Sequence, residues 1–258
     1  MKILTIKEIG EKFTQAGRLQ ARPLCIYGSD IIPKNAIPIN TINRCFANAI
    51  FTLAIKKEYN TLYIGEDVLK GCCPGGQAWF GYISFPPMLN YFISTGSKEY
   101  RNGAAEYLVA SPELAESRLK LMGKITPLGK YIIIRACEDI SEEKLNVKSI
   151  LCFGISEQIR NLSMLAYFSS NNPFDLIQMP MGPSCASFVT FPTGMAENGP
   201  ENRVIIGPTD PTGNYWFPPD YMSMGIPFEV AERMSEDFNN SFITKRSDVA
   251  FPKKRANI

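Results

Sequence analysis

The chain contains no histidine among its 258 residues. This absence excludes a Ser-His-Asp triad, a Cys-His pair within one chain and any metal site with a histidine ligand. Proton transfer would have to use Asp, Glu, Cys, Tyr, Lys or water. A metal ion would have to be held by cysteines and carboxylates.

Several sequence motifs are also missing. The chain has no CxxC pair and no GxxxxGK[ST] phosphate-binding loop. It has no apolar run near the roughly 18 residues that a membrane span needs, and residues 1–17 look like an amphipathic helix rather than a secretion signal. We therefore expect no membrane contact.

The charge is nearly balanced, with a formal net charge of +2. A nucleic-acid-binding protein usually carries a concentrated basic face, whereas the one basic run here is Lys253-Lys254-Arg255 near the C-terminus. We read that run as a solvated tail, and we expect no nucleic-acid partner.

Seven cysteines are present: Cys25, Cys45, Cys72, Cys73, Cys137, Cys152 and Cys185. The count is odd and several of them sit in apolar, strand-like runs. Free thiols in a reducing cytoplasm are therefore expected, in preference to a framework of disulfides.

Hydrophobic residues make up 45% of the chain, enough for a sizeable core. Helical periodicity predicts helices over residues 5–15, 43–57, 111–122 and 156–168, a short one within 83–96 and one opening at Pro227. Apolar runs predict strands at residues 22–27, 61–64, 106–110, 131–136, 149–153 and 204–206. Because helices and strands interleave without a strict βαβ rhythm, we predict an α+β (mixed α/β) fold in a single compact unit, 1–258.

Residues Gly71–Gly81 are the most distinctive stretch, with two adjacent thiols, a Pro-Gly pair and two bulky aromatic residues. Cys73-Pro74-Gly75-Gly76 fits a type II turn, after which a helix would start near Gln77. Backbone N–H groups at a helix start attract anions and lower the pKa of a nearby thiol. The stretch is therefore a candidate thiolate, metal or anion site, and the simpler reading is a tight turn flanked by buried cysteines.

The two halves of the chain share an order of features, which predicts an internal duplication over residues 22–82 and 149–219. Each half has a cysteine-containing strand, a cysteine that opens a helix (Cys45 and Cys185), a strand ending in glycine, and a Trp-Phe pair (Trp79-Phe80 and Trp216-Phe217). Two related α/β units would then pack about a pseudo-twofold axis. Cys45 and Cys185 would be symmetry mates near helix N-termini.

A set of features spread over most of the chain is shared with a known family. They are Cys45 before a helix, Gly71, Cys73-Pro74-Gly75-Gly76, Phe80-Gly81, strands 131–136 and 149–154, Gly182 with Cys185, residues 204–207 and residues 224–227. In these features the chain resembles the domain of unknown function 169 family of bacteria and archaea. The resemblance implies no particular activity, but it implies that Cys45, Cys73 and Cys185 belong to a shared feature. Pro208 stands where the family often carries a further cysteine, so a site that needs that ligand is in doubt here. Cys72 is this chain's own addition.

Three classes of function stay open. The first is a protein that binds a small ligand, anion or cofactor at the Cys-Pro-Gly-Gly turn between the two halves, with ligand-binding residues Cys73, Pro74, Gly75, Gly76, Trp79, Phe80 and Trp216, and Tyr215 as a further wall. The second is an iron–sulfur or soft-metal protein with Cys45, Cys73 and Cys185 as ligands. The third is a cysteine-dependent enzyme with Cys73 as nucleophile and Glu66, Asp67 or Tyr82 moving protons. The partner is a small molecule or cofactor in each case, and a homo-oligomer is compatible with all three.

Overall fold

One mixed sheet forms the centre of the protein. The computed structural model describes residues 4–140, 145–211 and 215–253, and within them the sheet has eight strands in the order β2-β3-β4-β1-β5-β8-β7-β6. Part of the predicted Pro-Thr-Gly turn (residues 211–213) and part of the basic run (Lys254 and Arg255) lie outside the described residues. The strands are β1 (Leu24–Ser29), β2 (Ile37–Pro38), β3 (Thr61–Ile64), β4 (Tyr131–Ala136), β5 (Val147–Ile155), β6 (Ile177–Gln178), β7 (Val204–Gly207) and β8 (Tyr221–Pro227).

The order of the strands is symmetric about the central β1–β5 pair. Each half has a parallel pair at its outer edge, β2 with β3 and β6 with β7, and two antiparallel pairings inside it. The elements of each half also follow the same order in the chain: an inner strand (β1 or β5), the edge strand (β2 or β6), a helix that starts at a cysteine, and two further strands. The predicted internal duplication, with a common origin of the two halves, stays a prediction.

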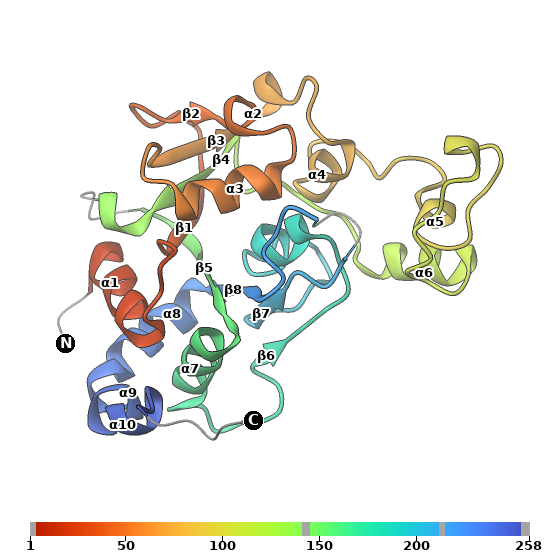
Figure 1. The fold of residues 1–258 in the computed structure, drawn as a ribbon. Coiled ribbons are helices and arrows are strands. Elements are labelled where there is room, and N and C mark those ends of the chain that lie inside the picture. The colour runs from red at the N-terminus through yellow and green to blue at the C-terminus, as the bar shows by residue number, and fades with distance from the viewer. Residues whose placement is uncertain (1–3, 141–144, 212–214, 254–258) are drawn as a thin grey trace.

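Helices cover both faces of the sheet (Figure 1). One face carries α1, α7 and α8, which pack against one another, and the other carries α3, α4 and the π-helix η4. Successive residues of a strand point to opposite faces of the sheet, so neighbouring residues contact different sets of helices. Phe153 of β5 contacts Phe51 of α3 and Phe188 of η4, whereas the next residue, Gly154, faces α7. The helices are α1 (Ile6–Gly17), α2 (Ile39–Ile42), α3 (Phe46–Ile55), α4 (Pro74–Trp79), α5 (Leu89–Phe92), α6 (Pro112–Leu121), α7 (Ser156–Tyr167), η4 (Ala186–Thr190), α8 (Phe228–Asp237), α9 (Phe242–Lys245) and α10 (Ser247–Ala250), with short 3-10 turns at η1 (Glu66–Val68), η2 (Arg101–Gly103), η3 (Cys137–Asp139) and η5 (Phe238–Asn240).

Two predicted helix starts are confirmed with their caps. Thr5 accepts from the backbone N–H of Glu8, whose carboxylate accepts from the N–H of Thr5, so the capping box of α1 is present. Ser111 caps α6 by accepting from the N–H of Leu114, with Pro112 in the first turn.

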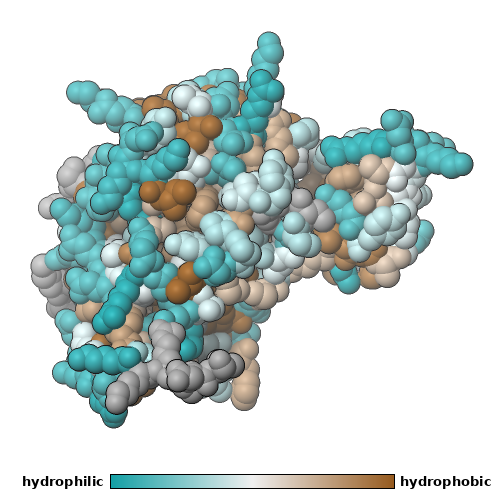
Figure 2. Space-filling view, viewed as in Figure 1, coloured by the Kyte–Doolittle hydropathy of each residue, from teal (hydrophilic) through white to brown (hydrophobic). Residues whose placement is uncertain are grey.

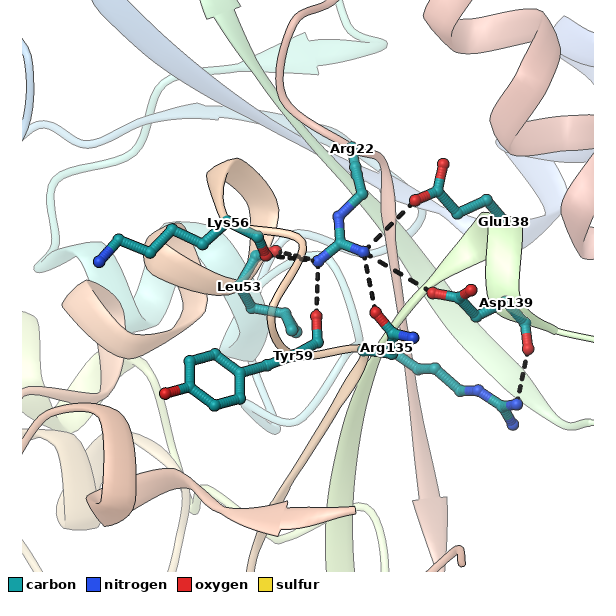
Figure 3. Close-up of polar contacts among 8 residues, drawn as sticks. Arg22, Leu53, Lys56, Tyr59, Arg135, Glu138 and Asp139 are labelled. Atoms are coloured by element: carbon teal, nitrogen blue, oxygen red, sulfur yellow. Dashed lines mark hydrogen bonds and ion pairs between the residues drawn. The ribbon is translucent and has the colours of Figure 1, made fainter. Parts of the chain in front are cut away.

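A buried arginine joins the end of α3 to the sheet (Figure 3). Nη2 of Arg22 donates to the backbone carbonyls of Leu53 (2.7 Å), Lys56 (2.8 Å) and Tyr59 (2.6 Å). Nη1 lies 3.3 Å from a carboxylate oxygen of Glu138. A cation at a helix C-terminus stabilises carbonyls that have no partner within the helix, so Arg22 fixes where α3 ends.

Residues 83–122 form a lobe that stands away from the sheet. The lobe contains α5 and α6 and lies in the sequence between β3 and β4 (Figure 1). It buries only Ser94, Val109 and Ala115 fully, and it projects from one side of the molecule in the space-filling view (Figure 2). The lobe therefore has little core of its own.

Parts of the predicted secondary structure are wrong. Residues 106–110 are not a strand, because the N–H groups of Glu106, Leu108 and Val109 bond to the carbonyls of Phe92 and Ile93 at the end of α5. The sequence prediction also missed β8, which runs over Tyr221–Pro227 before α8 opens at Phe228.

Candidate functional site

A cavity of about 650 Å³ lies between the lobe and the helices α3, α4 and η4. This volume suits a small organic ligand. Its floor comes from the N-terminal ends of the three helices, at Cys45, Cys73–Gly76 and Ser184–Cys185. Its other walls include Trp79 and Phe191, residues 180–183, 198–200, 209 and 210, and the lobe residues Pro86, Leu89, Phe92, Ile93, Tyr100, Arg101, Glu106, Leu108, Val109, Ala115, Arg118, Leu119 and Met122.

Three thiols from distant parts of the sequence reach this cavity. Cys45 and Cys185 stand directly before α3 and η4, and Cys73 stands directly before α4. The backbone N–H of Cys73 donates to the carbonyl of Arg44 at 3.0 Å, which holds Cys73 beside Cys45. The structure thus brings together the three cysteines that the sequence singled out.

The Cys-Pro-Gly-Gly element is a helix start and not the predicted type II turn. Pro74 occupies the first turn of α4, and Gly75 lacks the positive φ that such a turn requires. The φ of proline suits the second position of a type II turn and the first turn of a helix equally, so Pro74 does not distinguish between them. Gly76 is needed for packing, because a Cβ atom there would lie 2.7 Å from the ring of Phe46.

Burial governs the charge of two thiols at the cavity floor, those of Cys45 and Cys185. Burial raises the pKa of the Cys45 thiol, the N–H of Asn48 opposes this shift, and Cys73 adds to it. Burial raises the pKa of Cys185 still further, and the nearby thiols of Cys45 and Cys73 add to that shift. Cys45 and Cys185 are therefore neutral thiols at pH 7, although the N–H of Ala47 lowers the pKa of both.

The two tryptophans lie in different surroundings. Trp79 lines the cavity and packs edge-on against Phe191, and its carbonyl accepts from the hydroxyl of Thr190. Trp216 packs against Phe51 of α3, with a ring separation of 6.0 Å. Each tryptophan thus contacts the helix of the other half, but only Trp79 faces the cavity.

Five of the seven predicted ligand-binding residues line the cavity: Cys73, Pro74, Gly75, Gly76 and Trp79. Phe80 is fully buried and stacks on Phe46 with 5.3 Å between ring centroids. Trp216 packs against Phe51 away from the cavity lining, and Tyr215 is 93% exposed.

The residues considered for proton transfer lie elsewhere, near the end of β3. The hydroxyl of Tyr82 donates to the carbonyl of Ile64, and burial raises its pKa. The hydroxyl of Tyr63 donates to Asp67. Neither Glu66, Asp67 nor Tyr82 is among the residues that line the cavity.

The lobe supplies walls that sequence reasoning missed. Its aliphatic and aromatic side chains have helical or loop spacing typical of any small core, so nothing in their pattern indicated a cavity. Nη1 of Arg118 on α6 lies 3.1 Å from the sulfur of Met181, a contact that bridges the lobe to the segment before η4. Arg101 lies over the rings of Phe92 and Tyr100.

The metal-ligand prediction for Cys45, Cys73 and Cys185 stays a prediction. All seven cysteines are free thiols. Within residues 4–140, 145–211 and 215–253, no group of three or more His, Cys, Asp or Glu side chains could hold a metal ion in the arrangement seen.

Comparison with known proteins gives one match. The model of the DUF169 family, described as uncharacterised ArCR, matches residues 12–237. No curated protein and no solved structure matches the chain. In the part of the chain that the structure describes, no helix combines the length and the apolar character needed to cross a membrane.

Proposed function

This chain belongs to the DUF169 family, and we propose that it binds a small, largely apolar molecule in the cavity beside the three thiols. One observation carries the proposal. Five of the predicted ligand contacts, Cys73 among them, line one cavity of suitable volume together with the two other predicted cysteines, Cys45 and Cys185.

The character of the walls supports an apolar ligand over an anion. Leu89, Ile93, Leu108, Leu119 and Phe191 are all among the lining residues. The charges of the lining residues balance, since there are two arginines, Arg101 and Arg118, and two acidic residues, Glu106 and Asp210. Apolar walls favour a ligand through the area they remove from water, and a few polar groups set its orientation.

A bound ligand would contact thiols at the floor of the cavity and apolar side chains in its other walls. Neutral thiols are weak hydrogen-bond donors and behave as small, polarisable apolar groups. Free thiols persist in reducing compartments, so we place this binding in the cytoplasm.

A neutral fluorophore tests the proposal directly. N-phenyl-1-naphthylamine should bind with one saturable site and quench Trp79 in a variant that carries Trp216→Phe. Leu119→Glu should weaken this binding at least about tenfold, because a carboxylate would be moved into an apolar wall.

Leu121→Glu is the matched control. Leu121 lies on the same helix, is 69% exposed and does not line the cavity, so binding should not change. Circular dichroism checks that both variants keep their helices. Equal effects of the two substitutions, or no saturable binding to the parent protein, would contradict the proposal.

Metal analysis separates this proposal from the soft-metal alternative. Protein purified without oxygen should carry no stoichiometric iron or zinc. A stoichiometric metal that is lost on Cys73→Ser, with no binding of the fluorophore, would favour the thiolate-metal site instead.

A further inference from the structure

Cys45 and Cys73 are neighbours at the cavity floor. The backbone N–H of Cys73 donates to the carbonyl of Arg44, the residue directly before Cys45, at 3.0 Å. Both side chains line the cavity, and Cys73 is exposed while Cys45 is half-buried. Two thiols that are close together and open to a small molecule have the arrangement of a redox-active pair.

The remaining cysteines lack one of these two properties. Cys72 is buried with its thiol directed at the carbonyl of Val68, 3.4 Å away. Cys25, Cys137 and Cys152 are completely buried, and Cys25 and Cys137 are hydrogen-bonded to each other. Cys185 lines the cavity but is buried. Proximity and access therefore coincide at Cys45 and Cys73.

We propose that Cys73 and Cys45 form a reversible disulfide when a hydroperoxide enters the cavity. The Cys73 thiol loses its proton to solvent, and its sulfur attacks the outer oxygen of the hydroperoxide. The O–O bond breaks, the alkoxide takes up a proton and leaves as an alcohol, and Cys73 becomes a sulfenic acid. The sulfur of Cys45 then attacks that sulfur, the S–S bond forms, and water leaves with the hydroxyl group and the Cys45 proton.

The balance of this sequence is two thiols and one hydroperoxide giving one disulfide, one alcohol and one water. A dithiol reductant returns the pair to thiols by exchange and becomes a disulfide itself. The inference does not depend on the proposed ligand, because the cross-link is detected in protein without any ligand bound.

The experiment uses the Cys72→Ser protein, so that the peptide containing Cys73 has a single cysteine. This protein is treated with cumene hydroperoxide, digested without reductant and examined by mass spectrometry. We expect a peptide pair joined through Cys45 and Cys73 that disappears on treatment with dithiothreitol. Cys25 and Cys137 should stay reduced over the same time because oxidant does not reach them.

Three further variants make the assignment specific. Cys73→Ser should abolish the cross-link, and Cys185→Ser should leave it unchanged. Cys45→Ser should leave a sulfenic acid at Cys73 that dimedone traps. A cross-link between Cys73 and Cys185, a sulfinic acid at Cys73 with no cross-link, or equal oxidation of Cys25 would each overturn the proposal.

Discussion

Two adjacent glycines in α4 have different roles although they look equivalent in the sequence. Gly76 lies against the ring of Phe46, which in turn stacks on Phe80. The nearest atom to a Cβ at Gly75 would be the sulfur of Cys73 at 3.6 Å, an ordinary contact. Both glycines line the cavity, and Gly76 in addition allows α4 to approach α3.

Gly76→Ala should destabilise the protein by about 1 to 3 kcal/mol, because a methyl group would be forced against the Phe46 ring. Gly75→Ala should change the free energy of unfolding by less than about 1 kcal/mol, since alanine is well tolerated in a helix. Urea unfolding of both variants measures the difference. Similar losses in the two would show that the Phe46 contact does not decide the packing of α4.

Arg22 shows how one element is held at its end. It is 6% exposed, and its contacts to the carbonyls of Leu53 in α3 and of Lys56 and Tyr59 after it tie the end of the helix to the start of β1. Arg203 is a useful contrast, because its two-point contact with Asp175 lies nearer the surface, with the two side chains 32% and 48% exposed.

Arg22→Met should cost about 3 kcal/mol or more, since buried carbonyls would lose their donor. Arg203→Met should cost less than about 1 kcal/mol, as partly exposed ion pairs contribute little. The difference in urea midpoints between the two variants tests this expectation, and comparable midpoints would refute it.

The sequence predicted elements where local pattern and burial agree. The apolar runs at residues 61–64 and 131–136 are β3 and β4 with the expected bounds, and the α1 cap was read from Thr5 and Glu8. β8 was missed because Gly225 and Pro227 weaken the strand pattern, and only its pairing with β5 and β7 makes it a strand. Residues 106–110 have a strand-like composition but form hydrogen bonds with α5.

The candidate site was predicted as a set of residues but not as a place. Cys45, Cys73 and Cys185 were chosen from helix starts and a turn pattern, and the symmetric sheet is what brings those helix starts together. The lobe walls could not be predicted, because the cavity exists only once residues 83–122 pack back over α4 and η4.

Buried thiols make the whole molecule sensitive to alkaline pH. Burial raises the pKa of Cys137, Cys152 and Cys185 in the folded state. The stability linked to these thiols is fully present below the pKa of the unfolded chain, about 8.5, and is lost as the pH rises through the higher folded values.

The free energy of unfolding should therefore fall as the pH rises above about 8.5. Each such thiol contributes a slope of at most about 1.4 kcal/mol per pH unit. Cys185→Ala should reduce this slope, whatever its effect on stability at pH 7. Urea titrations at several pH values measure it, and a slope that is unchanged in the variant would rule out the contribution of Cys185.

Because of the position of the lobe in the chain, changes in the lobe sequence can occur separately from changes in the segments that carry the three cysteines. The lobe, residues 83–122, follows α4 in the connection between β3 and β4, and these two strands are antiparallel neighbours. A shorter, longer or exchanged insertion can therefore be accommodated without re-pairing any strand, while Cys45, Cys73 and Cys185 stay on the segments that adjoin the sheet. Under the proposed function, replacement of this one contiguous segment would change the walls that contact the ligand and leave the three cysteines of the floor in place.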